Sequence, residues 1–226
     1  MLLDFMATND WTRAVYFTSL SDIKNVLGID KYLHQEGLSH RFIPVLAADY
    51  HKDAGGVYVE GSYELLMADD INWGNLNKEG VVVDPESRRN LLFVKQAYMR
   101  LAQSLLNRGQ KDSAVAVLDR CLEFFPDEKV PYDFYMLAYP EIYYNAGAIE
   151  KGDELIDKII VNCMDNLRYY SGLDARFVPY YAETIRENLA MINEMSNIAR
   201  RSNRLELNVR LEKLLEQEFD KFMYLF

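Results

Sequence analysis

The sequence predicts a mainly α protein that begins with a small α+β unit and continues as an array of paired helices. Three observations support this fold class. Residues 1–84 of the 226 have short apolar runs separated by glycine and aspartate. Residues 85–226 instead carry apolar side chains at the spacings of three and four that one face of a helix produces. A helix pair in this second part is followed by a similar pair. We therefore predict two domains, residues 1–84 and residues 85–226.

The N-terminal unit is predicted to contain short strands. Residues 14–18 and 41–46 are rich in β-branched and aromatic side chains, and Pro44 places the second strand at a sheet edge or near a strand end. A short third strand is expected over residues 57–60. The other elements are a helix over 21–35 that Ser21 caps and Gly28 breaks or kinks, a turn over 51–56, a helical stretch over 63–68 and a loop over 69–80.

The second domain opens with a helix pair. Asp84, Pro85 and Glu86 supply an N-cap, a proline at the first helical position and an acid in the first turn. Gly109 ends this helix, and a second helix runs from about Asp112 until Pro126 stops it.

This pair resembles the tetratricopeptide repeat (TPR), which packs two antiparallel helices through small residues and turns at a glycine. The matching positions are Tyr98, Leu101, Ala102, Leu105, Gly109, Ala114, Leu118, Cys121 and Pro126. A second copy follows 38 residues later, with matches at Tyr139, Tyr143, Gly147, Gly152, Ile156 and Ile159. The repeats are predicted at about 95–128 and 133–166.

Two departures from the repeat carry structural expectations. Pro140 stands where the second copy should have a small residue, so we expect the helix to break near Tyr139. Residues 175–226 read as two long helices whose turn at Ser202 and Asn203 lacks glycine, and we interpret them as the capping helices of the array. An unspecialised helical bundle is the alternative for the whole region.

Composition and charge exclude several classes of function. Half of the residues are hydrophobic, which is too many for a disordered tail, and the net charge of −10 disfavours binding to nucleic acid through its phosphates. No apolar run approaches the length of a membrane span, and the first residues lack the basic start of a signal peptide. Two cysteines, Cys121 and Cys163, are too few for a disulfide scaffold, although one bond between them is conceivable in an oxidising compartment.

The residues that could carry chemistry do not form a catalytic pattern. His34, His40 and His51 lack the spacing of a metal site, and nucleophile, phosphate-loop and dinucleotide motifs are absent from the sequence. The pair Asp69 and Asp70 reads as a solvated loop rather than an acid–base pair. We therefore predict no catalytic residue, no cofactor and no metal.

A binding surface is the better prediction. In a TPR array the first helix of each pair lines a groove, and the candidate groove residues here are Gln96, Met99, Gln103, Asn107, Phe134, Leu137, Glu141, Tyr144 and Asn145, with Leu106 at a further groove position. These side chains are mainly apolar or amide, which disfavours a clamp for a C-terminal carboxylate and favours an apolar or weakly polar partner. The 16 tyrosines either fill the core or line a surface that grips a peptide or a sugar.

The N-terminal unit carries motifs of its own, at residues 11–17 (WTRAVYF), 32–38 (YLHQEGL), 41–44 (RFIP) and 71–75 (INWGN). With the helix pairs, this order resembles the C-terminal region of a family of large bacterial multi-pass membrane proteins. The N-terminal parts of those proteins resemble GT-C glycosyltransferases of the protein O-mannosyltransferase type. The resemblance covers about residues 11–160, and Ala14 departs from it where proline is expected.

The resemblance implies a context rather than an activity. The chain would be an extramembrane fragment on the periplasmic face, with residues 2–8 leading in from the membrane and the membrane part of the same polypeptide as its partner. The catalytic acids of the family lie in the membrane part, so we expect a non-catalytic accessory domain that recruits an acceptor polypeptide or another partner. The alternatives are a free-standing TPR adaptor and a carbohydrate-binding module.

Overall fold

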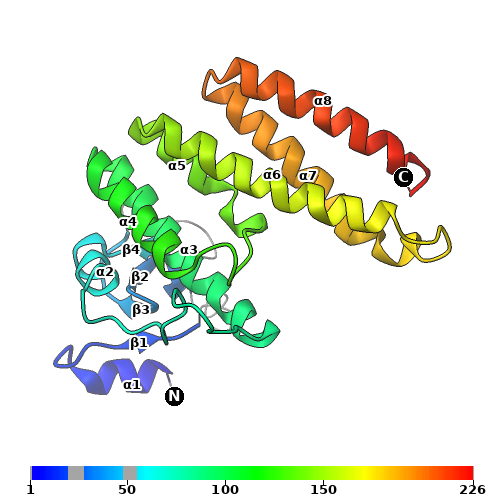
Figure 1. Cartoon of the computed structure of the whole chain (residues 1–226). Coiled ribbons are helices and arrows are strands. Elements are labelled where there is room, and N and C mark those ends of the chain that lie inside the picture. The colour runs from blue at the N-terminus through cyan, green and yellow to red at the C-terminus, as the bar shows by residue number, and fades with distance from the viewer. Residues whose placement is uncertain (1, 20–27, 48–54, 226) are drawn as a thin grey trace.

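The computed structural model describes residues 2–19, 28–47 and 55–225. It confirms a mainly helical fold with a small sheet near the N-terminus (Figure 1). The N-terminal unit comprises α1 (Leu2–Asn9), β1 (Tyr16–Phe17), the 3-10 turn η1 (Ile29–Tyr32), β2 (Leu33–Glu36), β3 (Ser39–Phe42), β4 (Gly56–Val57) and α2 (Val59–Leu66). The helical part comprises α3 (Pro85–Asn107), α4 (Lys111–Phe124), η2 (Phe134–Met136), α5 (Ala138–Ala146), α6 (Ile149–Ser171), η3 (Val178–Tyr181), α7 (Ala182–Arg201), α8 (Leu205–Phe222) and η4 (Met223–Leu225).

The described strands form one sheet in the order β1-β3-β2-β4. Strand β3 pairs antiparallel with both β1 and β2, whereas β4 runs parallel to β2. Gly55 lies just before β4 with φ of 66°, and a Cβ there would come within 2.4 Å of the Leu33 carbonyl oxygen. A glycine is therefore required where β4 passes so close to β2.

The prediction of a helix over 21–35 was wrong for the part that the structure describes. Ile29–Tyr32 form η1, and Leu33–Glu36 form strand β2, which pairs with β3 and β4. The side-chain amide of Gln35 in β2 also donates to the Ala97 carbonyl of α3 at 2.9 Å. That partner is 62 residues away, so local propensity could not reveal it. Ser21 and His51 lie outside the described residues, as does most of the predicted turn over 51–56.

The other N-terminal predictions hold with shifted bounds. The strands predicted over 14–18 and 41–46 correspond to β1 and β3, and Pro44 follows the end of β3. The third strand is shorter than predicted, since α2 already begins at Val59. The 69–80 segment is irregular, and the Asp84 carboxylate caps α3 by accepting from the Glu86 and Ser87 amides at 3.0 and 3.1 Å.

The described helices from α3 to α8, apart from the 3-10 turns, pair into three antiparallel hairpins with the same turn. Gly109, Gly147 and Asn203 adopt a left-handed conformation, with φ of 77°, 94° and 58°. The amide of the next residue then donates to the carbonyl five residues back, from Gln110 to Leu105 at 2.9 Å, from Ala148 to Tyr143 at 2.9 Å and from Arg204 to Ala199 at 2.8 Å. This is the Schellman arrangement. Asparagine does in the last turn what glycine does in the other two, so the last pair is built like the first two.

Small or polar side chains occupy equivalent positions around each turn. The two positions lie seven residues before and five residues after the residue with positive φ. They hold Ala102 and Ala114 in the first hairpin, Pro140 and Gly152 in the second, and Ser196 and Asn208 in the third. In the last hairpin the Asn208 amide donates to the Ser196 hydroxyl at 2.8 Å, so a buried hydrogen bond joins the helices.

Pro140 does not break a helix, because α5 begins only at Ala138. The proline then occupies the third helical position, where its missing N–H would have had no partner within the helix. The expected interruption near Tyr139 is therefore realised as a late start: α5 has 9 residues, whereas α3 has 23.

Helix α3 joins the sheet to the hairpins. The Arg100 guanidinium donates to the Gln35 side-chain oxygen at 3.0 Å and to the Gly55 and Gly56 carbonyls at 3.1 and 3.2 Å. The buried Tyr98 hydroxyl donates to the Leu66 carbonyl at 2.9 Å. In Figure 1 the sheet and α2 lie at one end of the molecule, and α8 lies at the other.

The turns allow a test of the repeat. Gly109→Ala and Gly147→Ala should each lower the free energy of unfolding by about 1–2 kcal/mol, because a left-handed residue with a Cβ is strained. Nothing lies within 4 Å of an added Cβ at either site, so packing does not contribute. Asn203→Gly, the matched control, should change stability by less than about 0.5 kcal/mol. Urea unfolding followed by circular dichroism measures all three, and unchanged stability in both alanine variants would contradict the turn geometry.

His40 provides a second test, at the junction of sheet and α3. Burial, and then the charge of Arg100, lower the pKa of this imidazole from 6.5 to about 4. Between these values the unfolded chain binds a proton that the folded chain does not, so the free energy of unfolding falls as the pH falls from about 6.5 to 4. We expect His40 to contribute about 1–3 kcal/mol to this loss, after allowance for its partial exposure.

The measurement is urea unfolding at pH 7 and at pH 4.5 for the wild type and for His40→Asn. The variant should lose less stability between the two pH values than the wild type does. An equal loss in both proteins would show that His40 is not the group responsible.

Candidate functional site

The predicted groove residues divide between three elements. Gln96, Met99, Gln103 and Asn107 lie on α3, Phe134 and Leu137 lie in and after η2, and Glu141, Tyr144 and Asn145 lie on α5. Some of them are used within the molecule. The Gln103 amide donates to the Asn107 side chain at 2.9 Å, and Glu141 pairs with Arg201 of α7 at 3.3 Å.

Tyr144 differs from the prediction because its side chain is buried rather than open to a groove. Its ring lies over Gly152, where an added Cβ would come within 2.4 Å of it, and its hydroxyl donates to Asp153 at 2.8 Å. Burial, followed by the hydrogen bond to Asp153, raises the pKa of this hydroxyl. Tyr144 thus joins α5 to α6.

The largest hollow among the pockets described below lies between η2, α6 and α7, and we call it the α6–α7 hollow. It has a volume of about 700 Å³, within the range of ligand sites. Its lining residues are Pro131, Tyr132, Asp133, Phe134, Tyr135, Asn162, Cys163, Asp165, Asn166, Thr184, Glu187, Asn188 and Met191. Phe134 is the predicted groove residue that lies in it.

The short α5 explains why this space exists. With 9 residues, α5 cannot cover all of the 23-residue α6. The segment 125–137, which contains η2, contacts the remaining part of α6, where the Asn162 amide donates to Asp127 at 2.8 Å. The hollow lies between this segment, α6 and α7.

The polar side chains of the hollow are held in place by hydrogen bonds. The Asn166 amide donates to the Asn188 side-chain oxygen at 3.1 Å, and the Asn188 amide donates to the Thr184 carbonyl at 2.7 Å. Asp133 accepts the Tyr135 amide at 3.1 Å, and burial raises the pKa of its carboxyl group. The walls of the hollow are therefore preorganised.

Sequence reasoning missed most of these residues. The repeat alignment placed the groove on the first helix of each pair, whereas the hollow draws on α6, which is a second helix, and on α7. The signal that pointed here was Pro140 together with the longer connection between the first two hairpins.

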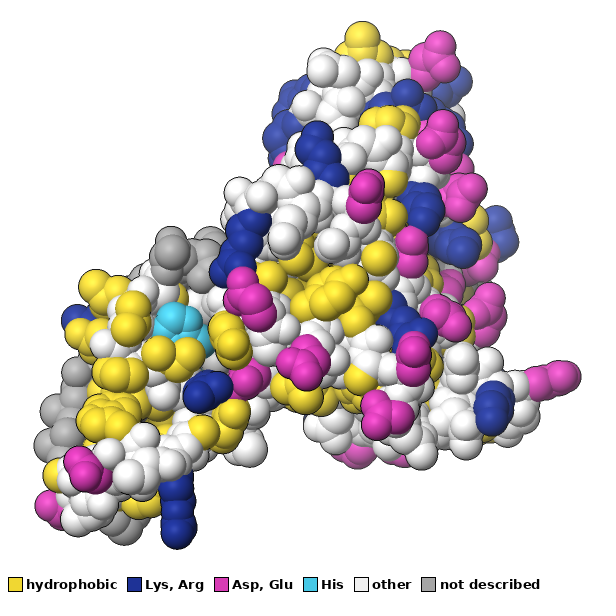
Figure 2. Space-filling view, turned by 90° about the vertical axis from the view of Figure 1, so that its left-hand side faces the viewer, with side chains coloured by type: hydrophobic (Ala, Val, Ile, Leu, Met, Phe, Trp, Pro, Cys, Tyr) yellow, Lys and Arg dark blue, Asp and Glu magenta, His cyan; other side chains and the backbone are white. Residues whose placement is uncertain are grey.

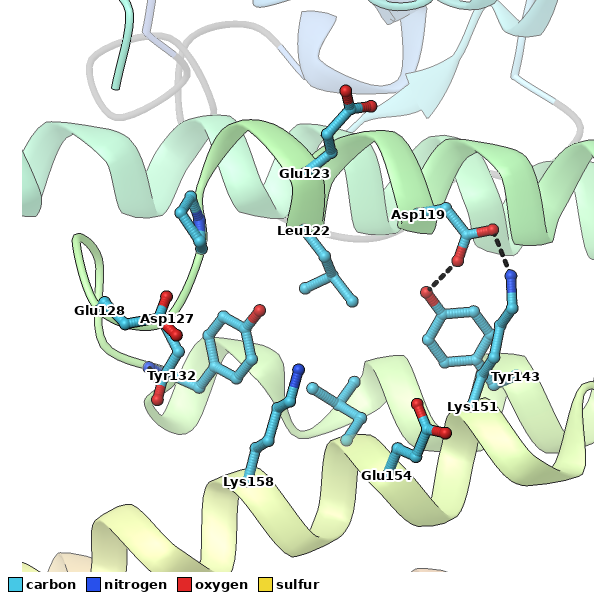
Figure 3. A pocket seen from close by; sticks show the side chains of 12 residues that line it. Asp119, Leu122, Glu123, Asp127, Glu128, Tyr132, Tyr143, Lys151, Glu154 and Lys158 are labelled. Atoms are coloured by element: carbon cyan, nitrogen blue, oxygen red, sulfur yellow. Dashed lines mark hydrogen bonds and ion pairs between the residues drawn. The ribbon is translucent and has the colours of Figure 1, made fainter. Parts of the chain in front are cut away.

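A second hollow of about 410 Å³ lies between α4 and α6 (Figure 3). In it Asp119 accepts the Tyr143 hydroxyl at 2.9 Å and pairs with Lys151 at 2.5 Å. Glu154 and Lys158 project from α6 toward α4, so both charge signs are present. Five carboxylates and two lysines line this α4–α6 hollow, so its acidic charge is compensated only in part, and it serves below as a control site.

The two histidines that the structure describes and both cysteines have structural positions. His34 is within 2.9 Å of the Val45 carbonyl oxygen through Nε2, and His40 faces Arg100. Cys121 and Cys163 are buried free thiols, and burial raises the pKa of each to about 12. In residues 2–19, 28–47 and 55–225 no group of three or more potential ligands could hold a metal ion.

Two motifs of the N-terminal unit contribute to a third pocket, which we call the arginine pocket. It measures about 450 Å³ and is lined by Trp11, Arg13, Ala14, Arg41, Phe42, Ile43, Pro44 and Tyr58. Trp11 stacks on Phe42 with ring centres 5.5 Å apart, and it has a positive φ of 56°. Residues from the 11–17 and 41–44 motifs, distant in sequence, thus form one surface.

Comparison with known proteins adds one assignment. Residues 1–60 match a family described as TMEM260-associated domain 2. No curated protein and no solved structure matches the chain. None of the described helices combines the length and the apolar character needed to cross a bilayer. The match covers the arginine pocket and the sheet, and it relates residues 1–60 to a domain that accompanies a family of membrane proteins.

Proposed function

We propose that this chain is a non-catalytic extramembrane domain of a membrane glycosyltransferase-like protein on its periplasmic face. Its N-terminal unit would dock on the membrane part of the same polypeptide, and its hairpins would recruit an acceptor polypeptide or a partner protein. The match of residues 1–60 to a membrane-protein-associated domain supports the docking role. The motif resemblance described above supports the glycosyltransferase context.

The observation that carries the docking proposal is the set of large apolar side chains that the N-terminal unit exposes. Six of them are each 47–61% exposed, namely Phe5, Trp11, Tyr16, Leu38, Val45 and Leu46. Figure 2 shows hydrophobic side chains gathered around a histidine on the lobe that holds the described N-terminal residues. An apolar surface of this kind usually marks an interaction site.

Capture of the membrane part tests the docking role. A tagged chain with Val45→Ser and Leu46→Ser should capture the separately produced membrane part at least about tenfold less well than the wild type, since two apolar contacts are lost. Leu205→Ser with Val209→Ser, on α8, is the matched control because these side chains are equally exposed at the far end of the molecule. Undiminished capture by the first variant, or an equal loss in the control, would refute docking through the N-terminal unit.

The non-catalytic assignment has its own test. The purified 226-residue chain, supplied with a lipid-linked sugar donor and an acceptor polypeptide, should transfer no sugar above the level without protein. The membrane part combined with the chain provides the positive control. Sugar transfer by the chain alone would refute the assignment. If the chain performs its cellular role when no membrane part is present, the free-standing adaptor is favoured instead.

A further inference from the structure

The α6–α7 hollow has the chemistry of a site for a donor-rich, positively charged group. Three carboxylates line it, from Asp133, Asp165 and Glu187, and the described lining includes neither lysine nor arginine. The amides of Asn162, Asn166 and Asn188 already donate to protein acceptors, so the side-chain oxygens of Asn162 and Asn166 remain for a ligand. The lining of the hollow therefore offers a ligand more hydrogen-bond acceptors than hydrogen-bond donors.

The cations nearby compensate this charge only in part. The buried Lys95 ammonium donates to the Val130 and Pro131 carbonyls at 2.9 and 3.4 Å and lies over the Tyr132 ring, and its charge opposes the effect of burial on the pKa of Asp133. Arg168 pairs with Asp165 at 3.1 Å, and both side chains are exposed. Glu187 of α7 also lines the hollow, and no lysine or arginine among the residues that the structure describes forms an ion pair with it.

The aromatic and apolar parts of the hollow suit the rest of such a ligand. Phe134 and Tyr135 are 64% and 46% exposed, and they pack edge to face with ring centres 6.4 Å apart. Aromatic faces beside carboxylates attract cations. Cys163 and Met191 contribute apolar lining that can contact an aliphatic stem.

We infer that the α6–α7 hollow binds an arginine or lysine side chain of an extended polypeptide segment. The aliphatic stem would lie along Met191, and the charged head would reach Glu187 and Asp133 beside the Phe134 ring. This inference rests on the proposed recruitment of a polypeptide and names the side chain that is recognised. An anionic segment is disfavoured by the carboxylates. A neutral sugar would leave those carboxylates without a counter-charge.

Peptide binding to the whole 226-residue chain tests this inference. The probes are a fluorescent 12-residue Gly/Ser peptide with two arginines and the same peptide with citrulline, which keeps the shape of arginine without its charge. Anisotropy should show at least about tenfold tighter binding of the arginine peptide. Equal affinities for the two peptides would overturn the inference.

Matched variants assign the binding to the hollow. Glu187→Gln should weaken the arginine peptide about fivefold, and Phe134→Ala should weaken it about two- to fivefold. Glu154→Gln changes the net charge equally but lies in the α4–α6 hollow, and Phe93→Ala removes an equally exposed ring from α3. These controls should bind as the wild type does. If a variant and its control lose the same affinity for the peptide, the binding is non-specific attraction by an acidic protein, and the proposed site is overturned.

A third probe, a neutral mannose oligosaccharide, tests whether the hollow binds a sugar instead of a basic side chain. Saturable binding of this sugar that Phe134→Ala abolishes, without any preference for arginine, would overturn the inference in favour of a carbohydrate site. The capture assay keeps the two proposals distinct, because Glu187→Gln should capture the membrane part as the wild type does. Lost capture in the Val45 and Leu46 variant with intact peptide binding would leave both proposals standing.

Discussion

The structure depends on α3, a helix that is buried from two sides. Toward the sheet, its Arg100 and Tyr98 bind backbone carbonyls of β4 and α2 and of the segment just before β4. Toward the hairpins, its Lys95 carbonyl accepts the buried Tyr139 hydroxyl of α5 at 2.7 Å. Because both contacts use polar groups with fixed directions, α3 fixes how the sheet and the helical array are oriented relative to each other. A surface on the N-terminal unit and a hollow among the later hairpins are thereby held in one defined arrangement.

The left-handed turns extend that arrangement along the chain. Each hairpin closes at a residue with positive φ, so the two helices of every pair are joined in the same way. The second hairpin differs from the others in its short first helix, α5, which has 9 residues, and in its long second helix, α6, which has 23. The late start of α5 avoids the cost of a proline inside a helix, and it opens the space between η2, α6 and α7. A local constraint on one residue thus produces the main candidate binding site.

Much of this fold was predictable from sequence, for physical reasons that are local. Glycine at 109 and 147, the Asp84 cap and the stop at Pro126 act within a few residues, and all appear where they were predicted. Strand β2 could not be predicted, because residues 33–36 become a strand through pairing with β3 and β4 and through the bond from Gln35 to α3. The turn at Ser202 and Asn203 was predicted, but its likeness to the two glycine turns was not, because asparagine adopts the left-handed conformation less often than glycine does.

The candidate site was less predictable, because it depends on how separate elements meet. Phe134 was identified, whereas Glu187 and the asparagines of α6 and α7 become neighbours only after the hairpins stack. Tyr144 was assigned to the groove by its repeat position, yet the lack of a side chain at Gly152 lets its ring turn inward.

Hydrogen–deuterium exchange on the chain, alone and bound to the membrane part, tests the central claim most directly. The account predicts slower exchange on binding for amides in residues 4–19 and 38–47, with α8 unchanged. Protection confined to α7 and α8, with an unaffected N-terminal unit, would contradict it.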